Sequence, residues 1–166
     1  MWQGLDRRLY REALSLKGLL TSNSLTLSLA ESCTGGEITS TLTKIPGASQ
    51  FLVGGVIVYW PFYKTHVVGV PEEVVETYGT VSYETAYELA RRIRHLSSSD
   101  IGLSVVCVLG PRPDEKGHSV GTTYIGIAYN DDVVVKHMTV VRMSRIDMKK
   151  LVALKSMLVL SEVIAR

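Results

Sequence analysis

Hydrophobic positions along the chain follow two spacings, one typical of helices and one typical of strands. Apolar residues at intervals of three and four predict helices, whereas short and nearly continuous apolar runs predict buried strands. The predicted helices are Leu5 to Leu20, a segment after Gly36, a short helix at the start of Phe62 to Val70, a segment from Pro71 to Gly79, Tyr83 to Leu96, and Met148 to Ile164. The predicted strands are Leu25 to Ala30, Phe51 to Tyr59, Ile101 to Leu109, Thr122 to Tyr129, and Val133 to Val141.

Helices and strands alternate along most of the chain, and only Asn130-Asp131-Asp132 separates the last two strands. Alternation of strand and helix favours a parallel sheet covered on both faces, whereas a short polar turn predicts an antiparallel hairpin. A length of 166 residues suits one domain of ordinary size. We therefore predict a single domain over residues 1–166. Its predicted fold class is α/β, a three-layer α/β/α sandwich with a mixed, centrally parallel β-sheet.

The segment Leu27 to Leu42 changes from an apolar run to a polar, glycine-containing turn and then to helical spacing. This layout places backbone N–H groups at a helix N-terminus, where anions and developing oxyanions are favoured. Gly35 and Gly36 allow a ligand to approach the backbone closely. The turn also has a purely structural interpretation, in which Ser32 or Thr34 caps the helix and the glycines ease the turn.

Two further segments break the regular pattern. The Gly54-Gly55 pair inside a predicted strand indicates a bulge or a close approach of another backbone. The stretch from Gly110 to Gly121 is long and irregular, and such loops usually cap a site or are mobile.

Charge and cysteine content narrow the class of protein. The net charge of +2 is nearly balanced, which argues against a general nucleic-acid binder. Cys33 and Cys107 form no CxxC pair and the four histidines are scattered, so we expect free thiols and no metal site. We also expect no cofactor. The charged N-terminal segment does not resemble a signal peptide, and no apolar run approaches membrane-spanning length. We therefore expect a soluble, cytoplasmic protein that does not bind membranes.

The order of several motifs resembles the C-terminal domain of the CinA family, the competence/damage-inducible proteins. These motifs are AESCTGG, IPGASQFLVGGVIVY, Lys64, VGVP and YGTVSYETA, and the resemblance covers nearly the whole chain. Active family members are nicotinamide-nucleotide amidases, so the resemblance implies hydrolysis of the carboxamide of nicotinamide mononucleotide to nicotinate mononucleotide and ammonia. It also implies a compact α/β/α fold, a stand-alone form without an N-terminal molybdopterin-binding-type domain, and a homo-oligomer.

The resemblance assigns chemical roles to particular residues. It implies that Ser32 is the nucleophile and Lys64 its base, with Tyr59 orienting the lysine or relaying a proton. Amide hydrolysis needs a nucleophile, a base and donors for the oxyanion, and a lysine acts as base only when its pKa is lowered. The N–H groups of Thr34, Gly35 and Gly36 are candidates for holding the oxyanion or an anionic group of the ligand. The residues implied to contact the substrate are Glu31, Cys33, Thr34, Gly35, Gly36, Gly55, Gly110 and Arg145.

Without the resemblance, these residues have ordinary interpretations. Lys64 alone would be a solvated lysine, and Tyr59 a packing residue at a strand end. Cys33 as a thiol nucleophile is a further alternative, although a lone cysteine beside a strand is more often buried and inert.

Three segments depart from the family pattern. Val106 replaces a threonine that lines the family's active site, Arg112-Pro113 replaces a Gly-Gly pair, and Trp60-Pro61 replaces Ser-Asn. These changes leave three hypotheses open. The chain is an amidohydrolase of nicotinamide mononucleotide, an amidase with a changed substrate, or a nucleotide-binding or interaction protein that has lost catalysis.

Overall fold

A computed structural model, which describes residues 2–141 and 143–166, contains every predicted helix and strand with boundaries shifted by a few residues. The helices are α1 (Trp2–Ser22), α2 (Glu37–Thr43), α3 (Glu72–Tyr78), α4 (Tyr83–Ser97) and α5 (Arg145–Ile164), with a 3-10 helix at Ala48–Gln50 and a π-helical turn at Tyr63–Val67. The strands are β1 (Leu27–Glu31), β2 (Leu52–Ile57), β3 (Ile101–Cys107), β4 (Thr122–Tyr129) and β5 (Asp132–Thr139).

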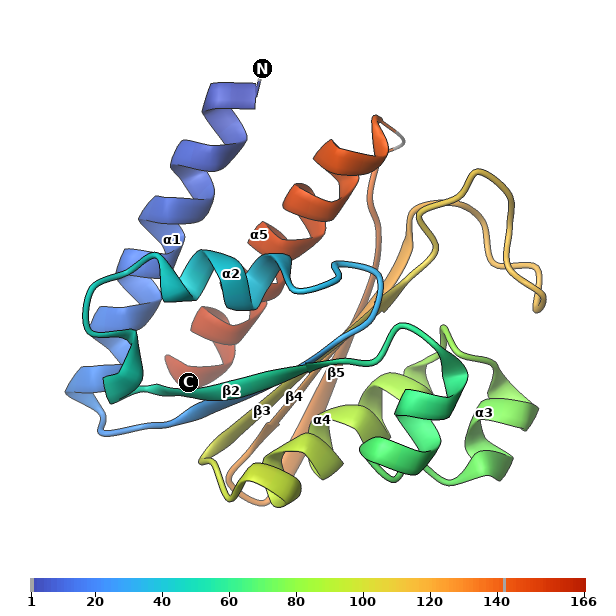
Figure 1. Ribbon diagram of the computed structural model, residues 1–166, viewed down its shortest axis with the longest axis horizontal. Helices are drawn as coiled ribbons and strands as arrows, with labels where there is room; N and C mark the ends of the chain where they lie inside the picture. Colours follow the sequence, from blue (N-terminus) through green and yellow to red (C-terminus); the bar gives the residue numbers. More distant parts are fainter. Residues whose placement is uncertain (1, 142) are drawn as a thin grey trace.

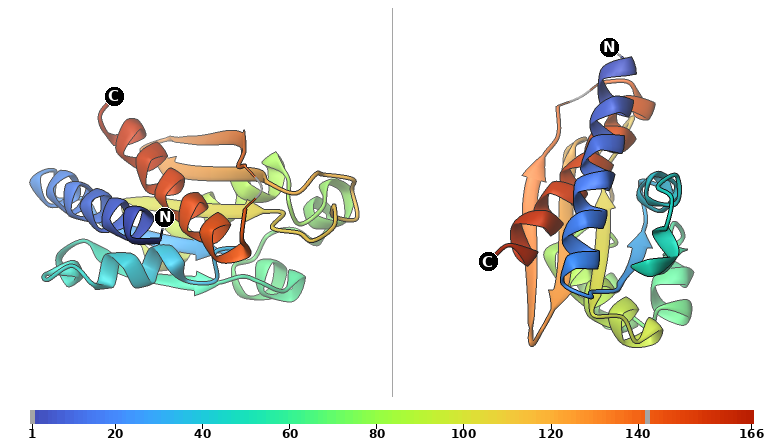
Figure 2. Two further views of the ribbon diagram at one scale, coloured as in Figure 1. Left: turned by 90° about the horizontal axis from the view of Figure 1, so that it is seen from above. Right: turned by 90° about the vertical axis from the view of Figure 1, so that its left-hand side faces the viewer.

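The strands form one mixed sheet in the order β2-β1-β3-β4-β5. Strand β1 is parallel to both β2 and β3, whereas β4 is antiparallel to β3 and β5. Helices α1, α2 and α5 cover one face of the sheet, and α3 and α4 lie on the other (Figures 1 and 2). The predicted α/β/α architecture with parallel strands at its centre is therefore confirmed.

A separate cluster of buried apolar residues packs against each face of the sheet. Alternate residues of β3 point to opposite faces, so Val105 packs towards α1 and α5, whereas Val106 packs towards α4. Helix α4 lies very close to the sheet, as the hydrogen bond of 2.6 Å from the Ser104 hydroxyl to the Ala86 carbonyl shows. A Cβ added at Gly102 would lie 2.1 Å from a carbonyl oxygen of α4, so only glycine permits this approach.

The predicted irregularity in the second strand is also present. The register between β1 and β2 shifts just before Gly54, which indicates a bulge. A Cβ added at Gly55 would lie 2.6 Å from the Thr39 hydroxyl oxygen, so α2 also approaches the sheet closely.

The connections bring several distant segments to one edge of the sheet. Strands β1, β2 and β3 all end there because they are parallel, and residues 110–121 join β3 to β4 at the same edge. The segment after β5 then leads into the N-terminus of α5. From β1 the chain moves to β2 on one side and later to β3 on the other, and ligands of such sheets bind at the strand ends beside this switch point.

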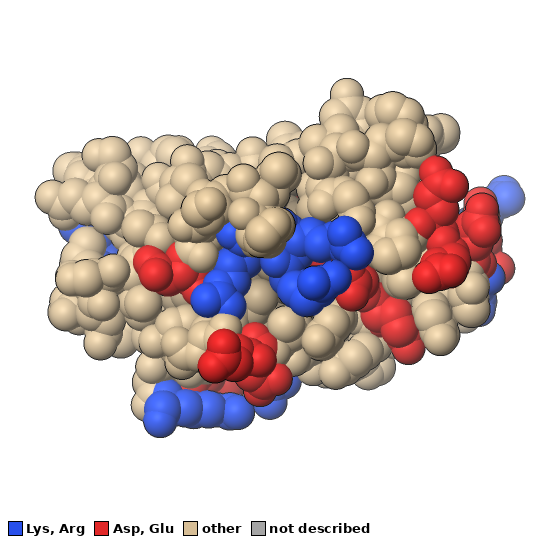
Figure 3. Space-filling model, turned by 90° about the horizontal axis from the view of Figure 1, so that it is seen from below, with Lys and Arg blue, Asp and Glu red and all other residues tan. Residues whose placement is uncertain are grey.

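The face formed by α3 and α4 carries charges of both signs (Figure 3). On α4, Glu88 accepts hydrogen bonds from Arg91 at 2.9 Å and from Arg92 at 2.6 Å, so part of the basic charge is paired locally. Within the described residues, no helix combines the length and the apolar character that crossing a membrane requires.

Candidate active site

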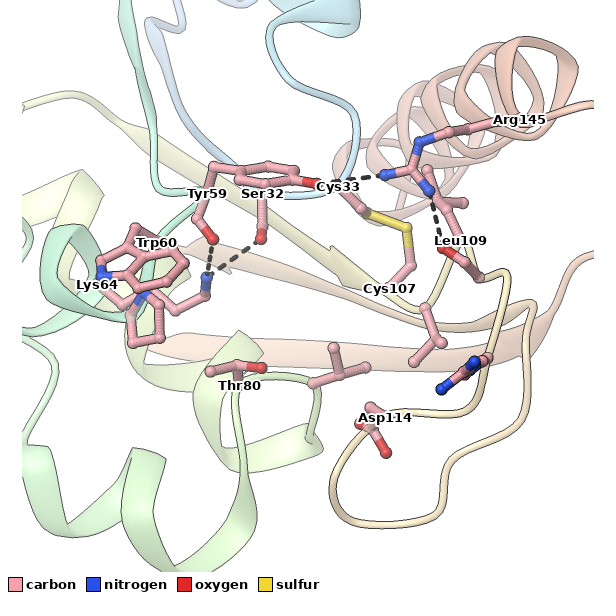
Figure 4. A pocket seen from close by; sticks show the side chains of 15 residues that line it. Ser32, Cys33, Tyr59, Trp60, Lys64, Thr80, Cys107, Leu109, Asp114 and Arg145 are labelled. Carbon is pink, nitrogen blue, oxygen red and sulfur yellow. Dashed lines mark hydrogen bonds between the residues drawn. A yellow bond between two sulfur atoms is a disulfide. The ribbon is translucent and has the colours of Figure 1, made fainter.

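A cavity of about 340 Å³ lies at the carboxyl ends of the parallel strands (Figure 4). This volume lies at the lower end of the range for small-molecule sites, roughly 300–1,000 Å³. Ser32 follows β1, Tyr59 follows β2, and Gly110 follows β3, so each of these wall residues comes from a different strand end. Cys33, Lys64 from the π-helical turn and Arg145, the first residue of α5, complete the part predicted from the sequence.

The Lys64 side chain reaches from the π-helical turn to the end of β1. Its exposed fraction is 1%, and Nζ lies 3.1 Å from the Ser32 hydroxyl oxygen. Two backbone carbonyls hold the amine from the other side, Val58 at 2.5 Å and Tyr59 at 3.4 Å. The solvated lysine that local sequence favours is therefore absent, and the lysine is buried in contact with the serine.

Burial also changes the acid–base behaviour of this lysine. It lowers the pKa of Lys64 from 10.5 to about 8, because the charged ammonium is disfavoured away from water. In the neutral amine, two N–H bonds can remain on the carbonyls of Val58 and Tyr59 while the lone pair faces the Ser32 hydroxyl. The arrangement can thus remove a proton from Ser32 near neutral pH.

Glu31 organises the turn that carries Ser32. Its exposed fraction is 1%, and its carboxylate accepts five hydrogen bonds of 2.6–3.1 Å. The donors are the Thr34 hydroxyl, the Thr39 hydroxyl, and the N–H groups of Gly36, Ile38 and Thr39. Glu31 does not line the cavity, although a direct contact with the substrate was expected. Its role in this structure is to hold the turn through these five hydrogen bonds.

The N–H groups of the turn divide into two sets. Gly35 donates to the Ser32 carbonyl at 3.1 Å and Gly36 to the Glu31 carboxylate, so two of the three expected oxyanion donors are occupied, and the third is Thr34. For Cys33 and Thr34, no acceptor is found for the backbone N–H among the described residues. These two N–H groups, one of which directly follows Ser32, remain available to a developing oxyanion. Thr34 itself is fully buried, and its hydroxyl is bound to Glu31.

The two polar groups of Tyr59 serve different partners. Its carbonyl accepts from Lys64, whereas its hydroxyl accepts from Arg145 Nη2 at 3.2 Å. Arg145 also donates from Nη1 to the Gly110 carbonyl at 3.0 Å, and thereby bridges the ends of β2 and β3 across the cavity (Figure 4). The Tyr59 side chain is therefore tied to the arginine, away from the lysine that it was expected to orient.

Comparison with known proteins identifies the family. Residues 11–164 match the model of the CinA C-terminal domain. The chain belongs to the CinA C-terminal domain family. It is 45% identical over 130 residues to a competence-damage inducible protein of Caldicellulosiruptor bescii, covering 78% of this chain and 31% of that protein. A CinA-like protein of Syntrophus aciditrophicus is 38% identical over 140 residues, covering 81% of this chain and 33% of its own length. The chain thus spans about a third of the length of these curated relatives.

Solved structures agree with this assignment. A competence or damage-inducible protein from Enterobacter asburiae superposes with a TM-score of 0.90 at 25% identity, covering 94% of this chain and 98% of that one. The competence/damage inducible protein CihA from Agrobacterium tumefaciens gives a TM-score of 0.89 at 25% identity, with 96% of both chains covered. The CinA fold is therefore common to these chains.

One expectation about the cysteines is wrong. Cys33 and Cys107 form a disulfide with a Cα–Cα distance of 5.6 Å, and neither is a free thiol. The pairing is possible because β1 and β3 are adjacent and parallel. Their register pairs Glu31 with Val105, so Cys33 and Cys107, each two positions further on, lie side by side. As a disulfide sulfur, Cys33 also cannot act as the thiol nucleophile considered above.

The departures from the CinA pattern fall in different places. Val106 is fully buried in the apolar cluster beneath α4 and is not among the residues that line the cavity. Trp60, Pro61 and Arg112 do line it. Gly55 lies against Thr39, and of the glycines expected to contact substrate only Gly110 is in the wall.

Several lining residues were not predicted as a site. They are Thr80, Val81, Cys107, Val108, Leu109 and Asp114. The available signal was glycine. Gly79 directly follows α3 and Gly110 lies three residues after β3, and both take the positive φ that favours glycine at a turn. Among the described residues, no group of three or more His, Cys, Asp or Glu side chains is placed to hold a metal ion.

Proposed function

We propose that this CinA-family domain is an amidohydrolase that acts on the carboxamide of nicotinamide mononucleotide. The observation that carries the proposal is the contact of 3.1 Å between Ser32 Oγ and the buried amine of Lys64, whose pKa is lowered to about 8. Such a pair is a nucleophile with its base. The choice of substrate rests on the resemblance to nicotinamide-nucleotide amidases. Such a substrate would place the reaction in the cytoplasm.

The proposed reaction begins with proton transfer from Ser32 to neutral Lys64. Ser32 Oγ attacks the carboxamide carbon, and the N–H groups of Cys33 and Thr34 stabilise the oxyanion that develops. The protonated Lys64 then gives its proton to the leaving nitrogen, which departs as ammonia. Water, activated by the same amine, hydrolyses the acyl-serine and regenerates the pair.

Arginine side chains suit the anionic end of a nucleotide. Arg112 and Arg145 both line the cavity, and the guanidinium group binds phosphate through paired N–H donors. Arg145 already holds Tyr59 and Gly110, so its orientation is fixed before substrate arrives. We assign these two residues to the phosphate, and the aromatic wall at Trp60 to the planar ring.

The test is ammonia release from nicotinamide mononucleotide by the wild type, Ser32→Ala and Lys64→Ala. We expect turnover by the wild type, with a loss of roughly 10²–10⁴-fold on removal of the base and a larger loss on removal of the nucleophile. Turnover that persists in Ser32→Ala would remove Ser32 from the nucleophile role.

The altered wall favours a second candidate in the same chemical class. Trp60, Pro61 and Arg112 are bulkier or stiffer than the family's residues at these positions and lie in the cavity wall. A panel of carboxamides with and without phosphate distinguishes a changed substrate from nicotinamide mononucleotide. Binding of the nucleotide without hydrolysis of any carboxamide would support the non-catalytic alternative.

We also propose that the chain forms a homo-oligomer through the β2 edge of the sheet. The β2 sequence, LVGGVI, has no charged residue, and Val53 and Ile57 are half exposed on it. The opposite edge strand, β5, carries Asp132 and Lys136, which discourage pairing. Light scattering should show a dimer or larger species for the wild type and a smaller one for Ile57→Lys. An unchanged mass would exclude this edge.

A further inference from the structure

The Cys33–Cys107 disulfide lies in the wall of the cavity that holds Ser32 and Lys64 (Figure 4). Both cysteines line the cavity and keep exposed fractions of 7% and 8%. The bond joins the residue directly after Ser32 to the last residue of β3, across 74 positions of sequence. A molecule in the cavity therefore meets the disulfide and the candidate nucleophile together.

The charge of the cavity wall favours the entry of an anionic molecule. Arg112 and Arg145 supply positive charge at every pH of interest, and Lys64 adds to it when protonated, below about pH 8. Of the described residues that line the cavity, Asp114 alone is acidic, and its carboxylate is occupied by the backbone of Lys116 and by the backbone and ring of His118. Disulfide exchange begins with attack by a thiolate, which is itself negative.

We propose that the Cys33–Cys107 disulfide is a redox modification site at which a small anionic thiol enters the cavity and forms a mixed disulfide. The thiolate sulfur bonds to one cysteine sulfur, the bond between the cysteines breaks, and its electron pair leaves on the other cysteine as a thiolate. A second thiolate attacks the mixed disulfide, the small disulfide departs, and both cysteines are left reduced and take protons from water. Two electrons pass from two small thiols to the protein.

The small thiol bound in the mixed disulfide would occupy the part of the cavity in which the substrate binds. This consequence rests on the proposed function. The turn at Ser32 should remain folded when the disulfide opens, because other contacts hold it. Glu31 keeps its five hydrogen bonds, and the Ser32 N–H donates to the Val105 carbonyl at 3.1 Å. The modified protein is thus folded but blocked.

The exchange step is tested with two probes, glutathione as the anionic thiol and cysteamine as the cationic one. The folded wild-type protein is exposed to equal thiolate concentrations of each, and opening is followed by alkylation and intact mass. We expect a glutathione adduct on Cys33 or Cys107, forming at least about tenfold faster than the cysteamine adduct. High salt and Arg112→Gln should reduce this ratio. Equal rates, or opening by neither thiol before the protein unfolds, would overturn the proposal.

A second measurement separates this proposal from the proposed function. Binding of nicotinamide mononucleotide is measured for the disulfide form and for the purified glutathione adduct, with a Cys33→Ala/Cys107→Ala variant as the control that cannot be modified. We expect the adduct to bind the nucleotide far more weakly than the disulfide form, whereas incubation with glutathione should leave the affinity of the variant, whatever its value, unchanged. If the adduct forms but the protein has no amidase activity, the redox site is supported and the proposed function is not. If the adduct binds the nucleotide as tightly as the disulfide form does, the proposal that the adduct blocks substrate binding is wrong.

Discussion

Lys64 Nζ lies 3.1 Å from Ser32 Oγ, although 32 positions separate the two residues in the sequence. The contact forms because β1 and β2 are parallel neighbours, so the segments after them meet at one edge of the sheet. The carbonyls of Val58 and Tyr59 fix the amine against the serine. A lysine held in this way is useful as a base only when it is neutral, which leads to the first prediction.

The pH dependence of the reaction should follow the ionisation of Lys64. Because the pKa of this lysine is about 8, we expect kcat/KM to rise about tenfold per pH unit below pH 8 and to level above it. Lys64→Arg, which keeps the positive charge throughout this range, should be inactive at every pH. A wild-type profile that is flat between pH 6 and 9 would contradict the role of Lys64 as base.

The same lowered pKa predicts how stability depends on pH. The pKa of Lys64 is about 8 in the folded state against 10.5 ordinarily, so between these values the unfolded chain binds more protons and stability rises with pH. Below pH 8 the full cost of burying the charge is present. Lys64→Met should therefore gain stability relative to the wild type below pH 8, and the difference should shrink by about 3 kcal/mol towards pH 10.5. Urea unfolding at several pH values measures this, with the exposed Lys44→Met as the control.

Removing the Tyr59 hydroxyl should affect substrate binding more than the base. That hydroxyl is bound to Arg145, whereas Lys64 uses the backbone carbonyl, which the substitution keeps. For Tyr59→Phe we expect KM to rise severalfold, about the effect of one lost hydrogen bond of roughly 1 kcal/mol, with the pH profile unchanged. A shifted profile would instead show that the phenol takes part in proton transfer.

Glu31→Gln should weaken the turn that carries Ser32. The amide replaces one carboxylate oxygen by a donor, which would face N–H or hydroxyl donors in a buried site. We expect a loss of about 3 kcal/mol in the free energy of unfolding and lower activity at temperatures where the variant is folded. Glu37→Gln, in the first turn of α2, removes the same charge without these five bonds and should change stability far less.

Two glycines in strands should respond very differently to alanine. At Gly102 a Cβ would lie 2.1 Å from the Ala90 carbonyl oxygen, whereas at Gly54 nothing lies within 4 Å. We expect Gly102→Ala to lower the free energy of unfolding by about 1–3 kcal/mol or more, because α4 must move away from the sheet. Gly54→Ala should be nearly neutral. Similar unfolding curves for the two variants would contradict the close packing of α4.

Much of the fold was determined by the sequence itself. The helical spacing of Leu9, Ala13 and Leu16 and the continuous apolar run of β3 reflect the burial of near neighbours in the chain, and both elements formed as predicted. The family motifs also pointed to Ser32 and Lys64. The spacing of hydrophobic residues carries this information because it records which side of an element faces the core.

Only the tertiary structure decided which strands are neighbours and which side chains of each strand point into the cavity. Cys33 and Cys107 are bonded because β1 and β3 are adjacent, a relation between segments 74 positions apart that no local pattern contains. Strand β3 is buried on both faces, so its sequence does not indicate that Cys107 lines the cavity while Val106 lies in the core beneath α4. Lys64 is likewise an ordinary lysine until packing removes its water, and that loss of solvation lowers its pKa.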